Sequence, residues 1–330
     1  MNSSPADKPS SYTSDPQNTL NVAVRYLSYL NPLQLHKRTR KVKAYFALAM
    51  VCFFWGTTWL ASRQAVLHMP ALQMAGMRQL IGGSCYVLFF LYKGATWPTR
   101  REWGSILVLS LLNFLLSNGL STWGVQYISA GLGSIIGAIF PLWLVVIGLF
   151  THPSELKKRT ILGLLIGFAG ICIIFYEHLS DFLLPDFRFG IFLSLAATWS
   201  WAFGTLYTKK HAAGFNPYFG LGLQMVLSGV TSLGISRAAG LFVPISSIPW
   251  QSWAAIGYLV VFGSIISFVA YLYALQYLPT TQLSLYAYIN PIVAVFLGSI
   301  LFGELLTIYI AIGVLVTLVG VYLVKGVDSE

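Results

Sequence analysis

Long apolar segments recur along almost the whole chain and constrain what it can fold into. Ten segments of mostly apolar residues each approach the length of about 20 residues that an α-helix needs to cross the hydrocarbon of a bilayer. Only 9% of the 330 residues are charged, against about a quarter in soluble domains. The sequence therefore predicts an all-α polytopic membrane protein with ten transmembrane helices, at residues 44–62, 71–92, 103–126, 129–150, 159–177, 189–210, 216–239, 250–277, 281–302 and 306–324.

Positive charges are spread unevenly between the two sides that these helices define. With the N-terminus inside the cell, 16 of the 20 Lys and Arg residues fall in cytoplasmic segments, three fall outside, and Arg78 lies within a span. Such enrichment marks the cytoplasmic side of membrane proteins. The count predicts a multi-pass protein of the cell inner (plasma) membrane with both termini cytoplasmic. Because the basic residues lie between apolar runs, no nucleic-acid partner is expected.

The two ends of the chain lie outside the ten segments. Residues 1–43 are predicted to form a cytoplasmic N-terminal tail, and residues 326–330 a short C-terminal one. Apolar residues between Leu20 and Leu27 recur at helical spacing, so part of the N-terminal tail is expected to be either a helix on the membrane surface or disordered. The tail has no early apolar run, which argues against a cleaved secretory signal.

Two parts of the chain repeat one another. Residues 123–141 match residues 273–291 at an offset of 150, and Trp55 matches Trp201 at an offset of 146. The copies span residues 44–177 and 178–325 and hold five predicted helices each. Since five is odd, the second copy would enter the membrane from the opposite face, which gives two inverted five-helix repeats. Such repeats are typical of secondary transporters, with a substrate site near the midplane, although membrane proteins that transport nothing also arise by duplication.

Three motifs carry a family resemblance. FFWGTTW, MRQLIGG and INPIVAVFLGSILFGELLT resemble the EamA family of the drug/metabolite transporter superfamily, and the resemblance extends over residues 44–325. It implies ten spans and the export of amino acids or other small metabolites. One position departs from the repeat, because Glu304 aligns with Ser154 and the nearest carboxylate, Glu155, is one place off. No role is therefore predicted for this position in the first half.

Aromatic and small polar residues interrupt the first predicted span. Gly56 would let a neighbouring helix or a substrate approach the backbone closely, and the Thr57 hydroxyl can bond to its own helix or to a ligand. Trp55 and Trp201 lie deep at matching positions, where they are expected either to line a cavity or to belong to the aromatic belt of the membrane interface. Trp59 lies nearer the outer end and is predicted to belong to that belt.

Arg78 is the one basic residue predicted to lie deep within a span, away from its ends. At about 1.5 Å per residue its depth is about 10 Å below the outer surface. A charge there costs about 2.5–3.5 kcal/mol on insertion scales, so it should face a polar cavity or helix ends. Two roles stay open: a counter-charge for a substrate carboxylate, or a donor to backbone carbonyls at a helix break, which we favour. Gln224, its counterpart in the second half, could make neutral hydrogen bonds there.

Further polar residues gather on the third, eighth and ninth predicted spans. Asn118 lies on a polar face of the third span, while Tyr271 belongs to the eighth and Asn290 to the ninth. Pro141 and Pro291 each remove a backbone donor and are expected to kink their helices, either as hinges for gating or as packing irregularities. The candidate substrate-cavity residues are Trp55, Gly56, Thr57, Arg78, Asn118, Trp201, Gln224, Tyr271, Tyr286 and Asn290.

These features together predict a secondary transporter that moves small organic metabolites across the inner membrane by alternating access, with an amino-acid or metabolite exporter as the first choice. An organelle-type metabolite or phosphorylated-substrate translocator, or a non-transporting membrane enzyme or assembly factor, are the alternatives. The expected partners are a small-molecule substrate and the lipid bilayer.

Several kinds of site are not expected. The sequence contains no Gly-x-x-x-x-Gly-Lys phosphate loop, so no ATP site is expected in this chain. No catalytic constellation, metal ligand set or cofactor site is expected either. Cys52, Cys85 and Cys172 lie in apolar runs and are interpreted as small buried hydrophobic residues.

The predicted orientation can be tested by labelling. Cysteines introduced at Asp181 and at Pro244, which the charge count places outside, should react in intact cells with a reagent that cannot cross the membrane. A cysteine introduced at Lys158 should stay unlabelled until the cells are opened. The reverse pattern would contradict the predicted topology.

Overall fold

The computed structural model describes residues 32–151, 158–176, 180–211, 215–284, 286–303 and 306–325, and all the secondary structure in these residues is helical. The chain divides into two units, Met1–Lys43 and Ala44–Glu330, and the site lies in the second. Three expectations fall outside the described residues: the surface helix or disordered tail near Leu20–Leu27, the C-terminal tail at 326–330, and the comparison of Glu304 with Ser154.

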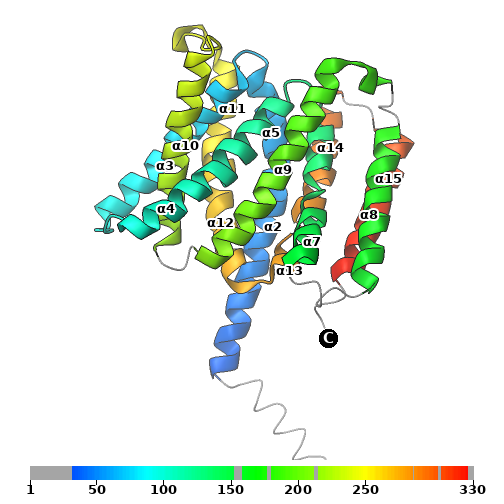
Figure 1. Ribbon diagram of the computed structural model, residues 1–330, viewed down its shortest axis with the longest axis horizontal. Helices are drawn as coiled ribbons and strands as arrows, with labels where there is room; N and C mark the ends of the chain where they lie inside the picture. Colours follow the sequence, from blue (N-terminus) through cyan, green and yellow to red (C-terminus); the bar gives the residue numbers. More distant parts are fainter. Residues whose placement is uncertain are drawn as a thin grey trace, which may run out of the picture. The chain divides into compact units, whose positions relative to one another are not determined.

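Helices follow one another through the first half of the chain with short connections (Figure 1). Ser110–Gly119 is a π-helix inside a longer helical segment. Proline or glycine precedes or follows several of the helices, as expected for residues that end helical hydrogen bonding. In order, the elements are α2 (Pro32–Val66), α3 (Ala71–Tyr92), α4 (Arg100–Leu109), η1 (Ser110–Gly119), α5 (Leu120–Gly124), α6 (Ala130–Gly137), α7 (Phe140–Thr151) and α8 (Lys158–Tyr176).

The second half has a closely similar order of elements. It also contains a π-helix, Leu259–Ile266, inside a longer helical segment, and two short 3-10 turns, η3 and η5. In order, the elements are η3 (Asp181–Leu183), α9 (Pro185–His211), α10 (Pro217–Ala238), η5 (Ile245–Ser247), α11 (Trp250–Tyr258), η6 (Leu259–Ile266), α12 (Ser267–Tyr277), α13 (Thr280–Leu283), α14 (Tyr286–Phe302) and α15 (Ile308–Lys325).

Seven helical segments within the described residues are long and apolar enough to cross a membrane: Thr39–Val66, Ala71–Tyr92, Arg100–Gly124, Ala130–Gly148, Pro185–His211, Pro217–Ala238 and Trp250–Tyr277. Three shorter apolar helices, Ile161–Ile174, Tyr286–Phe302 and Ile308–Gly320, fall within the other three predicted spans. Large apolar side chains such as Phe150, Phe296 and Leu315 are exposed, as expected for a surface that faces lipid. The chain is thus an all-helical, multi-pass membrane protein.

Cysteine burial differs in part from the expectation. Cys52 is buried, whereas Cys85 and Cys172 are exposed on the helix surface. The interpretation of all three as buried was wrong for these two, because an apolar run in a membrane protein has a lipid-facing side as well as a core side.

Each half passes through a π-helix at an equivalent place, which the sequence analysis did not predict. Residues 110–116 of η1 correspond to 260–266 of η6 at the offset of 150. A π-helix pairs a carbonyl with the N–H five residues further on, and two side chains at that spacing also contact such carbonyls. Asn118 Nδ2 donates to the Asn113 carbonyl (3.3 Å), and the Ser267 hydroxyl donates to the Phe262 carbonyl.

The two prolines lie in different settings. Pro291 lies inside α14, where its missing N–H removes the regular helical hydrogen bond to the carbonyl of Ala287. Pro141 is the second residue of α7, and α6 has already ended at Gly137. Regular α-helix is thus interrupted at residues 138 and 139, just before Pro141, inside the span Ala130–Gly148, and proline is tolerated in the first turn of the helix that follows.

The helices α3 and α10 cross at glycines that let their backbones touch. A Cβ atom added at Gly83 would lie 2.7 Å from the Gly222 carbonyl oxygen, and one added at Gly229 would lie 3.0 Å from the Gly76 carbonyl oxygen. Gly76 and Gly83 correspond to Gly222 and Gly229 at the offset of 146. Each contact therefore has a counterpart with the halves exchanged, and the two helices run antiparallel. Small residues at such crossings allow the close packing that holds helices together in lipid.

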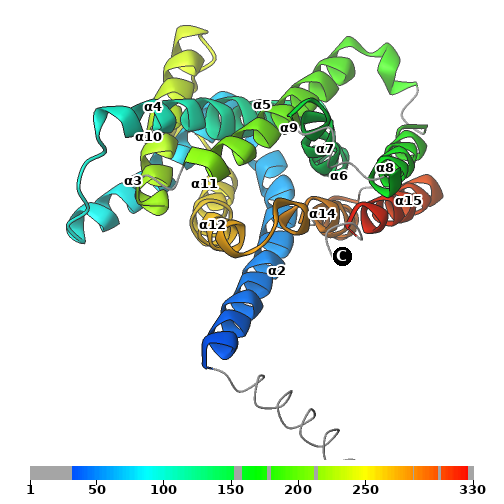
Figure 2. The ribbon, with the colours of Figure 1, turned by 60° about the horizontal axis from the view of Figure 1, so that its bottom comes forward.

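The same arrangement joins α8 to α15. A Cβ atom at Gly170 would lie 2.6 Å from the Gly313 carbonyl oxygen, and one at Gly320 would lie 2.5 Å from the Gly163 carbonyl oxygen. These positions correspond at the offset of 150. Figures 1 and 2 show α3 beside α10 and α8 beside α15, with residues 44–66 of α2 between the two pairs.

The glycine crossing predicts a difference between two substitutions on the same helix. Gly229→Ala places a Cβ atom 2.7 Å from the backbone nitrogen of Leu80, and overpacking of this kind typically costs about 1–3 kcal/mol. Gly234→Ala meets nothing within 4 Å. We expect a lower melting temperature of the detergent-solubilised protein for Gly229→Ala and an unchanged or slightly higher one for Gly234→Ala, because alanine is the better helix former. Equal melting temperatures would contradict the role given to this crossing.

Candidate functional site

A cavity lies among helices of both halves. The volume open to the centre of a water molecule is about 140 Å³. One water needs about 10–15 Å³ on this measure, so there is room for a compound of about ten non-hydrogen atoms. The walls are Trp55, Thr58, Trp59, Ser62, Arg78, Ser117, Asn118, Ser121, Thr122, Val125, Ser134, Gly137, Phe140, Ala197, Thr198, Trp201, Phe268, Tyr286, Ala287 and Asn290.

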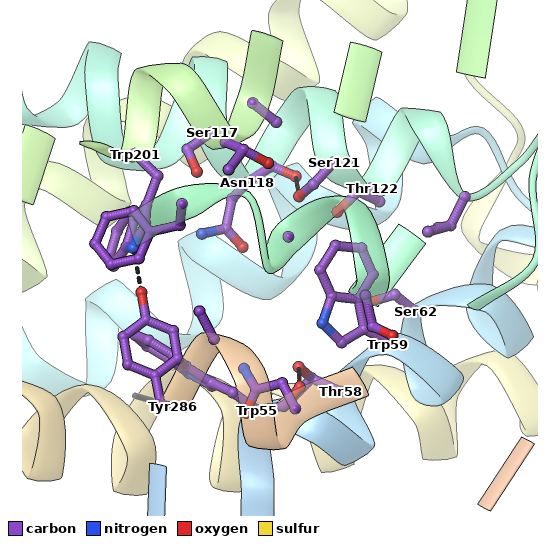
Figure 3. Close-up of a pocket in the computed structure, with 18 of the residues that line it drawn as sticks. Trp55, Thr58, Trp59, Ser62, Ser117, Asn118, Ser121, Thr122, Trp201 and Tyr286 are labelled. Carbon is purple, nitrogen blue, oxygen red and sulfur yellow. Dashed lines mark hydrogen bonds between the residues drawn. The ribbon is translucent and has the colours of Figure 1, made fainter. Parts of the chain in front are cut away.

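One side of the cavity is aromatic (Figure 3). Trp201 donates from its indole nitrogen to the Tyr286 hydroxyl, and the ring of Trp55 packs edge-on against both, with centroids 5.7 and 5.0 Å apart. The indole nitrogen of Trp55 donates to the Gly263 carbonyl of η6 (3.2 Å). Edge-to-face packing and a paired N–H are the favoured state of buried aromatic rings, so these rings form a fixed wall.

Hydroxyl and amide groups occupy the side contributed by η1 and α5. Ser117, Asn118, Ser121 and Thr122 border the cavity there. The Ser121 hydroxyl donates to the Asn118 carbonyl (3.1 Å). Groups of this kind can exchange hydrogen bonds with a ligand that enters.

Arg78 reaches the cavity from α3. Its side chain is 6% exposed, and its Nε donates to the Ser264 hydroxyl of η6 (3.0 Å). Gly263 makes room for the guanidinium group, because a Cβ atom there would lie 2.8 Å from Arg78 Nη2. Tyr86, also on α3, donates to the neighbouring Ser264 and Ile265 carbonyls. The π-helix η6 is thus tied to α3 by two side chains.

Asn290 both borders the cavity and joins two helices. With its amide turned so that the nitrogen faces acceptors, Nδ2 donates to the Tyr286 carbonyl (3.0 Å) and to the Cys52 carbonyl of α2 (2.8 Å). The second bond links α14 to α2 one turn from Trp55. Asn290 is buried, so both bonds are protected from water.

The structure places six of the ten predicted cavity residues on the wall: Trp55, Arg78, Asn118, Trp201, Tyr286 and Asn290. Gly56 and Thr57 lie elsewhere. A Cβ atom at Gly56 would lie 2.7 Å from Val293 Cβ, so this glycine serves the contact with α14. The Thr57 hydroxyl bonds to the Phe54 carbonyl and to the Tyr258 hydroxyl of α11. Both belong to the sides of α2 that face other helices.

Tyr271 and Gln224 border a separate, smaller cavity of about 20 Å³. Tyr271 lies behind the aromatic wall, where its ring packs against Trp55 and Trp201 and its hydroxyl bonds to Thr205. The structure does not place these two residues on the wall of the main cavity, because Trp201 and Phe268, which border both spaces, separate the smaller space from the larger one.

Sequence reasoning also misplaced or missed parts of the wall. Trp59 borders the cavity with its ring against Gly133 and Gly137 of α6, so its placement in the interfacial belt was wrong. Ser62 was not predicted, although the spacing of the α2 residues on the wall, Trp55, Thr58, Trp59 and Ser62, is that of one helical face. Thr122, Ser134 and Thr198 were also missed. Within the described residues, no group of three or more His, Cys, Asp or Glu residues could hold a metal ion.

Comparison with known proteins gives consistent matches. The model of the EamA-like transporter family matches residues 42–176 and 188–326. The chain is 33% identical over 83% of its length to the uncharacterized inner membrane transporter YedA of Escherichia coli (strain K12), of which 87% is covered. It is 28% identical over 88% of its length to the uncharacterized transporter YvbV of Bacillus subtilis, of which 93% is covered.

Two further matches come from a plant and from solved structures. The chain is 29% identical over 83% of its length to a chloroplastic WAT1-related protein of Arabidopsis thaliana, of which 67% is covered. A protein of known crystal structure is 16% identical in sequence to this chain and superposes on it with a TM-score of 0.65. The match covers 85% of this chain and 95% of the other. At that identity the match shows a shared fold.

The two bonds of Asn290 predict a difference between chemically equal substitutions. Asn290→Asp removes the donors and turns a carboxylate toward two carbonyl oxygens, which should cost at least the 1–3 kcal/mol typical of an unpaired buried group. Asn216→Asp should be neutral, because the Asn216 side-chain oxygen accepts from the backbone nitrogens of Tyr218 and Phe219 and aspartate accepts equally well at a helix N-cap. Melting temperatures of both variants in detergent check this, and a stable Asn290→Asp would refute it.

Proposed function

The chain belongs to the EamA-like transporter family, and we propose that it is a secondary transporter that carries small organic metabolites across the inner membrane by alternating access. The observation that carries the proposal is the cavity of about 140 Å³ bordered by residues of both halves. A space between two repeats is where secondary transporters bind their substrates.

The proposed architecture has ten spans in two inverted five-helix repeats. The paired glycine contacts of α3 with α10 and of α8 with α15 support it, because each contact recurs with the halves exchanged and the helices antiparallel. The uneven distribution of Lys and Arg supports cytoplasmic termini. The name of the E. coli relative, an inner membrane transporter, supports the same location here.

The proposed cargo is an amino acid or another small metabolite, and the proposed direction is export. The volume of the cavity suits a compound of that size, and its walls offer both aromatic faces and hydroxyl groups. A phosphorylated substrate fits less well, because Arg78 is the only Lys or Arg among the wall residues. An enzyme would need an acid, base or nucleophile in a convergent set, and the described walls do not contain one.

Alternating access requires the halves to move against each other around the cavity. We place the flexible points at the break before Pro141 and at Pro291 inside α14, since both interrupt regular helical hydrogen bonding. Residues 44–66 of α2 bond to η6 through Trp55 and contact α14 through Gly56. A movement of α14 would therefore displace the aromatic wall.

The proposal predicts that the aromatic wall is needed for transport. Trp201→Ala removes the donor to Tyr286 and one face of the cavity. Uptake of labelled amino acids and other metabolites into liposomes containing the purified protein should fall at least tenfold, with normal membrane insertion. Trp250→Ala is the matched control, since this tryptophan is 73% exposed at the start of α11. Unchanged transport by Trp201→Ala, or no transport of any metabolite by the unaltered protein, would contradict the proposal.

A further inference from the structure

Two arginines on neighbouring helices are bound in different ways. Arg63, on α2, donates through Nη1 to the carbonyls of Val125 and Gln126 (2.8 Å to the latter), just beyond the end of α5. This is the carbonyl-binding role that was favoured for Arg78 from the sequence. Arg78 instead makes one hydrogen bond within the described residues, to the Ser264 hydroxyl. A guanidinium group has five N–H donors, so most of the donors of Arg78 are left for another acceptor.

No carboxylate of the described residues borders the cavity beside Arg78. The described acidic residues are Glu102, which bonds to Thr99 at the start of α4, Asp181 in η3, and Asp186 in the first turn of α9. None of these is a wall residue. A buried charge is costly unless it is paired, and the charge of Arg78 therefore favours an anion in the cavity.

The other wall residues indicate which chemical groups such an anion would have besides its negative charge. Trp55, Trp59, Trp201 and Phe268 offer apolar faces, and the space accepts about ten non-hydrogen atoms. A single arginine matches a single carboxylate, which it can hold through two parallel hydrogen bonds. An ammonium group on the same ligand would lie near a positive charge, with no carboxylate of the described walls to compensate for its desolvation.

We infer that the cavity binds a small organic monocarboxylate with an apolar or aromatic body, that Arg78 binds the carboxylate, and that a cationic group on the ligand is not required. This inference rests on the proposed function, because it names the chemical class of the transported compound. It departs from the amino-acid expectation on one point. Between two compounds of equal shape, the one without an ammonium group is the better ligand.

Three probes of similar shape separate the contributions of the two charged groups. 3-Phenylpropionate has only the carboxylate, phenylalanine has both groups, and 2-phenylethylamine has only the ammonium. Isothermal titration calorimetry with the full chain in detergent should show the strongest binding for 3-phenylpropionate, weaker binding for phenylalanine and none for 2-phenylethylamine. Binding of the amine equal to or stronger than that of 3-phenylpropionate, or no binding of either carboxylate at millimolar concentration, would overturn the inference.

Variants of Arg78 test which residue binds the carboxylate. Arg78→Gln should weaken 3-phenylpropionate binding about 10- to 100-fold, the range expected for losing a hydrogen bond to a charged group. Arg78→Lys keeps the charge and loses the fork, so it should bind more weakly than the unaltered protein and still prefer the carboxylate to the amine. Melting temperatures show whether each variant folds. If Arg78→Gln does not fold, Arg78→Lys decides, and undiminished affinity in that variant overturns the inference.

Arg63→Gln is the matched control. This substitution removes an arginine that binds backbone carbonyls, so it should lower the melting temperature while the order of the three probes stays the same. A reversal of that order in Arg63→Gln, with Arg78→Gln unaffected, would assign the carboxylate to Arg63 and overturn the inference.

Transport measurements distinguish this inference from the proposed function. The three probes are offered to liposomes containing the unaltered protein or Arg78→Gln. Binding of carboxylates through Arg78 without any transport would overturn the transport function and leave the ligand class standing. Transport of 2-phenylethylamine that Arg78→Gln does not change would leave the transport function standing and overturn the ligand class.

Discussion

Where α3 crosses α10, each helix offers glycines to the backbone of the other, and the resulting position of α3 determines where the cavity walls lie. The Gly83–Gly222 and Gly76–Gly229 contacts bring the helix axes as close as their backbones allow. From that position α3 extends Tyr86 and Arg78 to η6. The same π-helix provides the carbonyl that pairs with Trp55. The aromatic wall and the charged group of the cavity therefore depend on one backbone contact between the halves.

The π-helices explain how polar groups can be placed inside such an apolar protein. An extra residue in a helical turn changes which side chains face a given neighbour and disturbs the regular hydrogen bonds. In η1 and η6 the Asn113 and Phe262 carbonyls accept hydrogen bonds from the side chains of Asn118 and Ser267. Asn118 and Ser117 then border the cavity, and Ser264 holds Arg78. Asn118 thus bonds to the backbone and borders the cavity at the same time, which limits the cost of burying it.

Much of the fold could be predicted from the sequence, because apolar length and charge placement are strong signals in a membrane protein. The repeat could also be read, and it marked Trp55 and Trp201 as equivalent. The rotation of each helix was harder to predict. Both the lipid side and the core side of a span are apolar, so the side of α2 that carries Gly56 and Thr57 could not be told from the side that carries Trp55 and Ser62.

Other errors have local causes. Trp59 was assigned to the membrane interface from its position along the helix. That position does not indicate that the Trp59 ring packs against glycines of α6. Tyr271 was placed in the cavity because the eighth span is polar there, yet the indoles of Trp55 and Trp201 cover it. The π-helices escaped prediction because no single residue type specifies them. The errors at Trp59 and Tyr271 concern the distance of a side chain from another element, which a single sequence does not contain.

The exchanged glycine contacts also bear on how this sequence can change over time. Gly83 meets Gly222, the counterpart of Gly76, and Gly76 meets Gly229, the counterpart of Gly83. A larger residue substituted for one of these glycines would collide with the backbone of the other half. The sequences of the two halves therefore cannot change independently at these positions. Substitution remains open where the partner leaves space, as at Thr317, the counterpart of Gly167, whose hydroxyl lies 3.5 Å from the Gly167 carbonyl. The two halves have diverged over most of their length. They are thus expected to stay similar at the glycine positions where their helices cross.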